Sequence, residues 1–457
     1  MENILNSINN DAPVKDELDV KNLKVIGEIP KDLTGIYMRN GPNPVFPANP
    51  YHFTFDGDGM VHAIYLAEGK AHYRNRYIDT KGLARERRAG KALYSSITNP
   101  RPMDPEWAMP EDGPVARKNS ASMNVIPHAG KFLALFEGHP PYEITEQLQT
   151  VGEWTPYDSQ HSFSTSAHTR RDPVSGGLWF IHYGVLSPSL TIYCVNNQGA
   201  IAKKWQVNKS YSSMVHDFAL TKNYIIIFDC PVVFDVKRSL SGQSMIDWQP
   251  ELGTRIGIIS RDGKETRWFI TEPFFVFHFA NAYENAHEIV IDYVRHEHGD
   301  FFSSNVNATK PVSNLYRTIV DLHFGTVKHI SLDEKIVEFP SICENYNTQP
   351  HQYIYAEMNN GETNAIIKWD VNKQNSYQYV FEKSTQLSEA IFAPCANAAV
   401  EDQGYLLLFV YNNISMQSEF VILAANDFHH PPLARIQMPR RIPRGFHGSW
   451  TSGAWEW

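Results

Sequence analysis

Short runs of apolar and β-branched residues recur along the whole chain and predict a protein built from many short strands. Each run is bounded by turn-forming sequences such as NNQG, RDG, NNG or EDQG. The clearest predicted strands are Lys131–Glu137, Gly177–Tyr183, Leu190–Val195, Tyr224–Cys230, Arg255–Ser260, Glu288–His296, Gln352–Met358, Ala365–Asp370, Tyr405–Asn412 and Glu419–Ala424. Helical periodicity is scarce, and Pro141–Val151 is the best candidate for a helix. The pattern therefore predicts an all-β fold.

Two closed architectures suit so many strands: a large sandwich or barrel, and a propeller whose four-stranded blades surround an axis. No repeat is obvious, and the WD and kelch signatures are absent. Three polar or proline-rich stretches, Ile97–Ser122, Phe234–Gly253 and His296–Asn314, are too long for simple hairpin loops. We expect them to lie over one face as a lid. Because no linker divides the chain, we predict a single domain over residues 1–457.

Composition narrows the classes of function. The chain has 41 Lys and Arg against 50 Asp and Glu, a net charge of −9, which argues against a nucleic-acid partner. Its four cysteines are far apart in the sequence, as expected of reduced thiols. The sequence begins with no basic stretch followed by an apolar one, and no apolar run is long enough to span a membrane. Together with the cysteines, these features predict a cytoplasmic protein. Rossmann, P-loop, G-x-S-x-G and H-E-x-x-H motifs are absent, which disfavours nucleotide enzymes, serine hydrolases and helical zinc proteases.

The 19 histidines are the most informative residues of the composition. Six lie in polar surroundings and are predicted to be surface or loop residues: His52, His62, His72, His298, His429 and His430. Four others adjoin predicted strands in aromatic or apolar stretches: His168, His216, His278 and His447. In a propeller, equivalent positions on the innermost strands converge on the axis. These four histidines could therefore meet around one metal ion. The acidic sequence FDGDGM, by contrast, is interpreted as a tight turn and not as a metal site.

At these histidines the chain resembles the carotenoid cleavage oxygenases, non-haem iron enzymes that use O2 to split an alkene into two carbonyl products. The likeness begins at GEIPKDLTGIYMRNGPNP and FDGDGMVHA and continues through LALFEG, SAHTRRDP, MVHDFALT, FHFANAYE and VEFP to GFHGSW. The fold of that family is a seven-bladed β-propeller with a dome of loops and helices over its top face. The resemblance predicts this fold here and explains the long insertions.

The resemblance also implies a metal site. One Fe(2+) per chain is expected, with the ligands His168, His216, His278 and His447. Three glutamates, Glu137, Glu338 and Glu389, are expected to accept the Nδ1–H of three of these ligands and to orient their rings. No organic cofactor is expected. The substrate tunnel should be apolar, with candidate lining residues Phe136, Phe274, Phe275, Phe277, Phe279 and Tyr283.

The implied activity is oxidative cleavage of a C=C double bond of a carotenoid or apocarotenoid. Members of the family that cleave phenolic stilbenes carry a lysine immediately before the first of the three glutamates, where this chain has Phe136. An apolar ring cannot deprotonate a phenol, which favours a polyene substrate. Because Tyr94 or Lys118 could replace that lysine, a stilbene- or phenylpropenoid-cleaving dioxygenase is the alternative. A non-cleaving isomerase or a binding scaffold is a third, weaker interpretation.

The expected partners are an apolar polyene and O2. Family members often present an apolar patch around the tunnel mouth, and Pro102–Pro114 is the candidate here for a weak peripheral contact with a membrane. Its acidic residues disfavour an anionic surface. The basic stretch Arg440–Arg444 is interpreted as structural.

Overall fold

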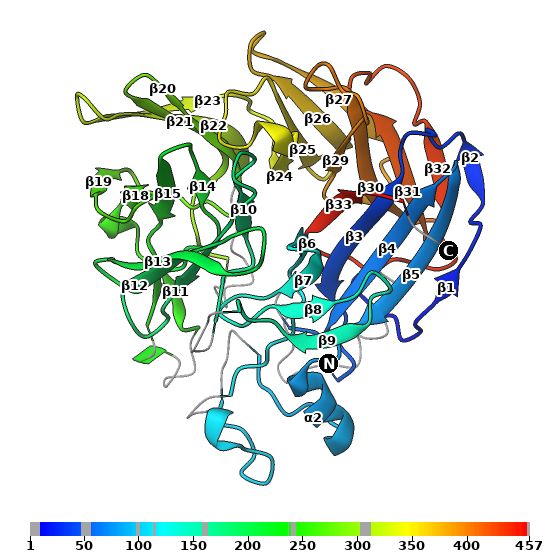
Figure 1. Cartoon of the computed structure of the whole chain (residues 1–457), viewed down its shortest axis with the longest axis horizontal. Helices are drawn as coiled ribbons and strands as arrows, with labels where there is room; N and C mark the ends of the chain where they lie inside the picture. The colour runs from blue at the N-terminus through cyan, green and yellow to red at the C-terminus, as the bar shows by residue number, and fades with distance from the viewer. Residues whose placement is uncertain are drawn as a thin grey trace.

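The computed structural model describes residues 10–46, 56–96, 101–112, 116–157, 163–235, 237–238, 244–301 and 312–454. Almost all of the regular structure in these residues is antiparallel sheet, and seven sheets surround a common axis as the blades of a propeller (Figure 1). The prediction of a seven-bladed β-propeller is therefore confirmed.

The seven blades follow one another along the chain, with strands as follows. The first blade contains β1 (Asp19–Val20), β3 (Gly35–Pro42), β4 (Gly59–Ala67), β5 (Lys70–Tyr77) and β33 (Gly448–Ser452). The second contains β6 (Asn124–His128), β7 (Lys131–Leu135), β8 (Tyr142–Ile144) and β9 (Thr150–Glu153). The third contains β10 (Thr169–Arg171), β11 (Leu178–Tyr183), β12 (Ser189–Val195) and β13 (Ile201–Asn208). The fourth contains β14 (Ala219–Leu220), β15 (Tyr224–Asp229), β18 (Thr254–Ser260) and β19 (Thr266–Thr271).

The remaining three blades complete the ring. The fifth contains β20 (Phe279–Asn285), β21 (Glu288–His296), β22 (Ser313–Asp321) and β23 (Thr326–Ser331). The sixth contains β24 (Val337–Ser341), β25 (Tyr353–Asn359), β26 (Asn364–Asp370) and β27 (Asn375–Phe381). The seventh contains β28 (Thr385–Leu387), β29 (Ile391–Pro394), β30 (Gly404–Asn412), β31 (Gln417–Ala424), β32 (Ala434–Gln437) and β2 (Val25–Gly27). Because β33 pairs with β3 and β2 pairs with β32, the two ends of the ring are joined through sheet hydrogen bonds.

The core lies between neighbouring blades, which explains why the central strands read as continuous apolar runs. In β15, Ile225 and Ile227 pack toward the third blade, while Ile226 and Phe228 pack toward the fifth. Successive side chains of a strand point to opposite faces, and both faces of a blade are covered here. All ten predicted strands are present, with bounds that shift by one or two residues.

The helix predicted at Pro141–Val151 is wrong. The segment forms β8 and β9, joined by a turn in which Leu148 has a φ of 64°. Tyr142 and Ile144 are buried against the first blade in this arrangement, and β8 pairs with β7. Pairing with an existing sheet outweighs a weak helical pattern in eleven residues.

Two of the histidines predicted at the surface are instead buried. His62 on β4 and His72 on β5 are each only 3% exposed. The Nδ1 of His62 lies 2.8 Å from the hydroxyl of Tyr73, and the Nε2 of His72 lies 2.5 Å from Asp19. His429 and His430 are exposed as predicted, and His298 is half-buried, whereas His52 lies outside the described residues.

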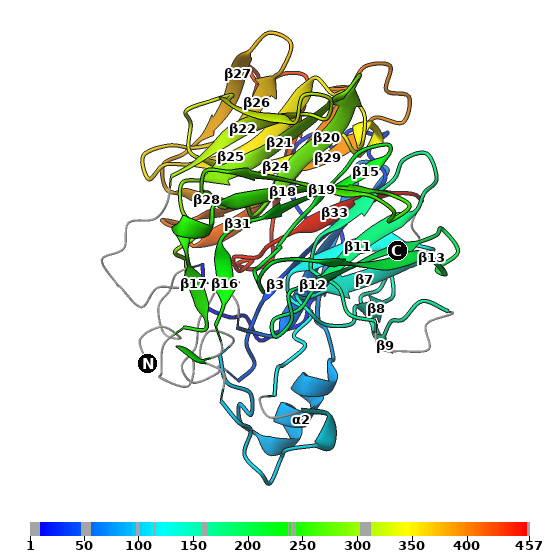
Figure 2. The ribbon, with the colours of Figure 1, turned by 90° about the vertical axis from the view of Figure 1, so that its left-hand side faces the viewer.

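A small cover stands outside the blades. It includes the helix α2 (Lys81–Ala89), the 3₁₀ turns η1 (Pro110–Asp112) and η2 (Pro250–Leu252), and the ribbon of β16 (Val232–Phe234) and β17 (Ile246–Trp248). In Figure 2, α2 projects below the propeller. A third 3₁₀ turn, η3 (Glu344–Tyr346), belongs to the sixth blade. Residues of α2, β16 and β17 line one cavity, so the cover lies over the face that carries the site described below.

Candidate metal centre

The four predicted histidines come together where the innermost strands of four blades begin. His168, His278 and His447 each directly precede an inner strand, namely β10, β20 and β33. His216 lies three residues before β14. Because these positions are equivalent in their blades, the side chains converge on the propeller axis.

The ring nitrogens that face the axis lie within 4.8 Å of one another. The Nε2 atoms of His168 and His216 are 3.0 Å apart, and the ring of His168 is centred 4.4 Å from that of His447. His168 is 5% exposed, and the other three side chains are nearly as buried. Four buried imidazoles around one point form a candidate metal site.

A glutamate stands behind each of three of these histidines. The Nδ1 of His278 lies 2.6 Å from Glu338, that of His216 lies 2.9 Å from Glu137, and that of His447 lies 3.1 Å from Glu389. A carboxylate that accepts the Nδ1–H leaves Nε2 free to bind a metal and fixes the ring. In the described part of the chain, no carboxylate is paired with His168.

The glutamates are themselves held in place. Glu338 also accepts from the Nε2 of His296 at 2.7 Å and from the backbone N–H of Phe339 at 2.5 Å. Glu389 accepts from the N–H of Gly448 at 3.0 Å, and Glu137 accepts from the Tyr183 hydroxyl at 3.0 Å. Burial alone would raise the pKa of Glu338, but His278 and His296 hold that pKa well below its usual value. The carboxylate is therefore ionised at neutral pH.

The donor atoms fit a divalent transition metal. Burial, together with the three neighbouring imidazoles, holds the pKa of His168 well below its usual value, so its ring is neutral. Burial also lowers the pKa of His278 despite the opposing effect of Glu338. The buried Nε2 of His278 has no hydrogen-bond partner among the described residues. Such an atom is costly unless a ligand satisfies it, and neutral imidazole nitrogens are good metal ligands.

A hydrogen-bond network that the sequence did not reveal joins three of the four histidine segments. The Asp217 carboxylate accepts from Arg170 Nη2 at 2.5 Å and from the N–H of Phe279 at 3.0 Å. The same Arg170 donates to the carbonyls of Phe218 and Phe279. These residues follow His168, His216 and His278 by one or two positions in the chain, so the network sets the spacing of three blades just beside the ligands. The only sequence signal was the proximity of Arg170 and Asp217 to two of the histidines.

The fourth histidine is held by the backbone of the first two blades. The N–H of His447 donates to the carbonyl of Met123 at 3.1 Å, and its carbonyl accepts from the N–H of Asn40 at 3.0 Å. The side-chain amide of Asn40 in turn donates to the carbonyls of Ala121 and Asn124. Each ligand is thus positioned by buried hydrogen bonds.

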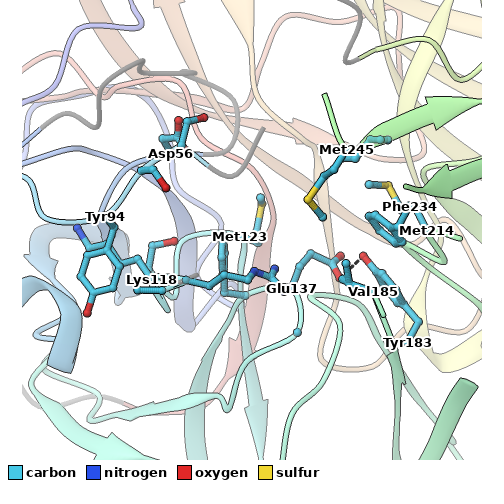
Figure 3. Close-up of a pocket in the computed structure, with 18 of the residues that line it drawn as sticks. Asp56, Tyr94, Lys118, Met123, Glu137, Tyr183, Val185, Met214, Phe234 and Met245 are labelled. Carbon is cyan, nitrogen blue, oxygen red and sulfur yellow. Dashed lines mark hydrogen bonds between the residues drawn. The ribbon is translucent and has the colours of Figure 1, made fainter. Parts of the chain in front are cut away.

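A cavity of about 700 Å³ opens beside His216. Apolar residues of its wall include Phe136 and Phe277. Met214, Phe234 and Met245 lie together on one side of the cavity (Figure 3). Three of the segments that line it, at residues 116–120, 234 and 245–246, belong to the stretches predicted to cover one face. A volume of this size is typical of a site for a medium-sized organic ligand.

Two of the aromatic residues predicted for a tunnel, Phe136 and Phe277, are on this wall, and the others are not. Phe274, Phe275 and Phe279 are almost fully buried in the core between the fourth and fifth blades. Phe275 lies behind Phe277 at a ring distance of 4.6 Å. Tyr283, farther along β20, packs edge-on against His351.

The far end of the cavity is polar. Lys118 forms ion pairs of 2.5 Å with both Asp58 and Glu86, and Tyr94 lies nearby on the same wall (Figure 3). Burial would lower the pKa of Lys118, but the two carboxylates raise it, so the ammonium group stays charged. Asp58 belongs to FDGDGM, which the sequence analysis interpreted only as a turn.

The chain matches a sequence model of the family described as RPE65, retinal pigment epithelial membrane protein, over residues 11–452. It belongs to the carotenoid cleavage oxygenase family. A carotenoid 9,10(9′,10′)-cleavage dioxygenase 1 of Arabidopsis thaliana is 30% identical, over 96% of this chain and 88% of that protein. These matches support a place for the protein in a family of dioxygenases.

Solved structures of relatives share the whole fold. The lignostilbene dioxygenase of Pseudomonas brassicacearum superposes with a TM-score of 0.89 at 27% identity and covers 96% of this chain and 97% of its own. A cobalt-substituted apocarotenoid oxygenase of Synechocystis gives a TM-score of 0.87 at 28% identity and covers 99% of both chains. The carotenoid cleavage oxygenase family thus includes relatives named for carotenoids and relatives named for stilbenes. Among the described residues, no helix is long and apolar enough to cross a membrane.

Proposed function

We propose that this carotenoid cleavage oxygenase binds one Fe(2+) and cleaves a C=C double bond of a carotenoid or apocarotenoid into two carbonyl products. The observation that carries the proposal is the four-histidine site, with its three glutamates, beside a largely apolar cavity. His168, His216, His278 and His447 would hold the metal, which supplies the binding and activation of O2. The stoichiometry is simple, because one O2 provides one oxygen atom to each of the two new carbonyl groups.

The chain's own residues bind and orient the substrate. Phe277 and Met214 flank His216 and present an apolar surface to the double bond. Phe136, which is only 4% exposed, stands where the stilbene-cleaving members carry lysine, and it offers no group that could bind a phenol. The apolar wall also excludes water from the reacting carbons. These features favour a polyene over a phenol.

Turnover of matched substrates tests the proposal. The iron-loaded protein is incubated with oxygen-18 gas and a panel of carotenoids, apocarotenals and hydroxystilbenes, and the products are identified by mass spectrometry. We expect labelled carbonyl products from an apocarotenal, with a kcat/KM at least about tenfold above that for a hydroxystilbene. Faster turnover of the hydroxystilbene would contradict the proposed substrate class. If the protein consumes no O2 with any of the alkenes, the isomerase or scaffold interpretation is favoured.

The cleavage of a stilbene or phenylpropenoid is the second candidate, because Tyr94 and Lys118 line the polar end of the cavity. Lys118 is already engaged by Asp58 and Glu86, so it is a poor base for a phenol. Tyr94→Phe separates the two functions. The variant should lose hydroxystilbene cleavage if the phenol binds at Tyr94, and should leave apocarotenal cleavage unchanged under the first proposal.

We also propose that residues 1–457 form a single domain and that the protein is cytoplasmic. The pairing of β2 with β32 and of β33 with β3 supports one closed unit. The four cysteines are free thiols, three of them buried, which suits a reducing compartment.

A further inference from the structure

Among the described residues of the cavity wall, Arg117 is the one charged side chain for which no polar partner is seen. Its side chain lines the cavity together with Glu137 and Gly138. Among the described residues it takes part in no hydrogen bond or ion pair. Its Nη1 lies 3.6 Å from the point where a side chain on Gly138 would begin. The guanidinium group thus lies within ordinary van der Waals distance of Gly138, whose φ is +72°.

The side chain of Arg117 lines the cavity and is exposed, and the protein around it also affects its charge. Desolvation by this protein lowers the pKa of the guanidinium group. The group stays protonated at neutral pH in any case. A cation that is partly removed from water is stabilised when an anion or several acceptors compensate its charge.

The neighbouring charges do not supply that compensation. The charge of Glu137 acts on Arg117, but one oxygen of this carboxylate lies 2.9 Å from His216 and the other accepts from Tyr183. Lys118, the adjacent residue in the chain, is the opposite case, since two carboxylates hold it at 2.5 Å. The protein thus neutralises one cation of the cavity and leaves the other available.

We propose that Arg117 binds the carboxylate group of the substrate, so that the cavity takes an elongated alkene that carries a carboxylic acid. The planar guanidinium group presents parallel N–H donors that match the two oxygens of a carboxylate. The apolar wall formed by Phe136, Met214 and Phe277 would contact the hydrocarbon part of the same molecule. The inference rests on the proposed function, because it names the class of alkene that this site accepts.

A pair of ligands that differ only in charge tests the inference. The metal-loaded protein is titrated under nitrogen with an apocarotenoic acid and with its methyl ester, and binding is followed by quenching of tryptophan fluorescence. We expect the acid to bind about tenfold more tightly than the ester, a preference that Arg117→Gln removes and Arg117→Lys partly keeps. The matched control is Arg88→Gln, which removes an exposed arginine of α2 that does not line the cavity.

Equal affinity for the acid and the ester in the unaltered protein would overturn the inference, as would a preference that survives in Arg117→Gln. Metal content and the melting temperature show that each variant is folded, and Arg117→Lys keeps the test valid if the glutamine variant is unstable. The measurement needs no turnover. A protein that binds the acid but cleaves no alkene would refute only the proposed function, whereas one that cleaves apocarotenals without preferring the acid would refute only the role of Arg117.

Discussion

The metal centre and the cavity beside it are built in different ways. The four histidines stand at the starts of inner strands, and buried hydrogen bonds through Asp217, Asn40 and three glutamates hold their segments. Most of the cavity wall comes from segments that connect the strands of the blades, among them residues 94–96, 116–118 and 184–187. A rigid scaffold suits chemistry that requires exact geometry, and loops allow the choice of substrate to change without altering that scaffold. Substitutions in the two regions should therefore differ in size and in kind.

The removal of a ligand should have the largest effect. His447→Ala deletes one of the four converging nitrogens and leaves Glu389 without its histidine. We expect the metal content to fall below the detection limit and turnover to drop by more than about 1,000-fold. Metal analysis and O2 consumption measure the two effects. His430→Ala, which alters an exposed histidine, is the control, and full activity of His447→Ala would refute the four-histidine site.

Loss of charge behind a ligand should have a smaller effect. Glu338→Gln keeps the shape of the side chain but removes the charge that pairs with both His278 and His296. We expect the affinity for the metal to fall by about 10- to 100-fold, with the fold intact. Titration against a metal chelator measures this affinity. Glu362→Gln at an exposed site is the control, and an unchanged affinity would show that Glu338 does not act through His278.

Disruption of the hydrogen-bond network around Asp217 should have the third-largest effect. Asp217→Asn weakens the link with Arg170 that ties together the third, fourth and fifth blades. A small displacement of the ligands should lower kcat by about tenfold and change KM little. The spectrum of the cobalt-substituted variant should shift, which a loss of global stability alone would not produce. Asp262→Asn, at an exposed turn, is the control and should change neither kcat nor the spectrum. If Asp217→Asn has the same kcat and spectrum as this control, Asp217 has no positioning role.

A substitution in the cavity wall should have the smallest effect, and this effect should be confined to the binding of the substrate. Met245→Ala enlarges the apolar part of the cavity without removing a metal ligand or one of the glutamates behind the ligands (Figure 3). We expect KM to rise by a factor of about three to ten, while metal content and affinity stay the same. Met416→Ala, which alters an exposed methionine outside the cavity, is the control. Loss of metal in Met245→Ala would contradict the separation of the two regions.

Much of the fold could be predicted from the sequence because local pattern and burial agree in the central strands. Runs such as YIIIFD and YLLLFVYN are apolar throughout since neighbouring blades cover both faces of β15 and β30. Local pattern failed at Pro141–Val151, where a helical spacing of apolar residues gave way to pairing with β7. It failed again at His62 and His72, because the neighbours in sequence did not reveal that both rings are buried and paired with Tyr73 and Asp19.

The candidate site, like the fold, could be predicted from the sequence only in part. The sequence by itself determined the strands and singled out His168, His216, His278 and His447 with Glu137, Glu338 and Glu389, because these residues stand in distinctive motifs at strand ends. Only the tertiary structure decided that Phe277 faces the cavity while Phe275 and Phe279 do not, and that Asp217 links three blades. It also decided that Arg117 lies beside Gly138 with no polar partner in the part of the chain that is described. Such facts depend on which segments meet around the axis, and those segments lie tens to hundreds of residues apart in the chain.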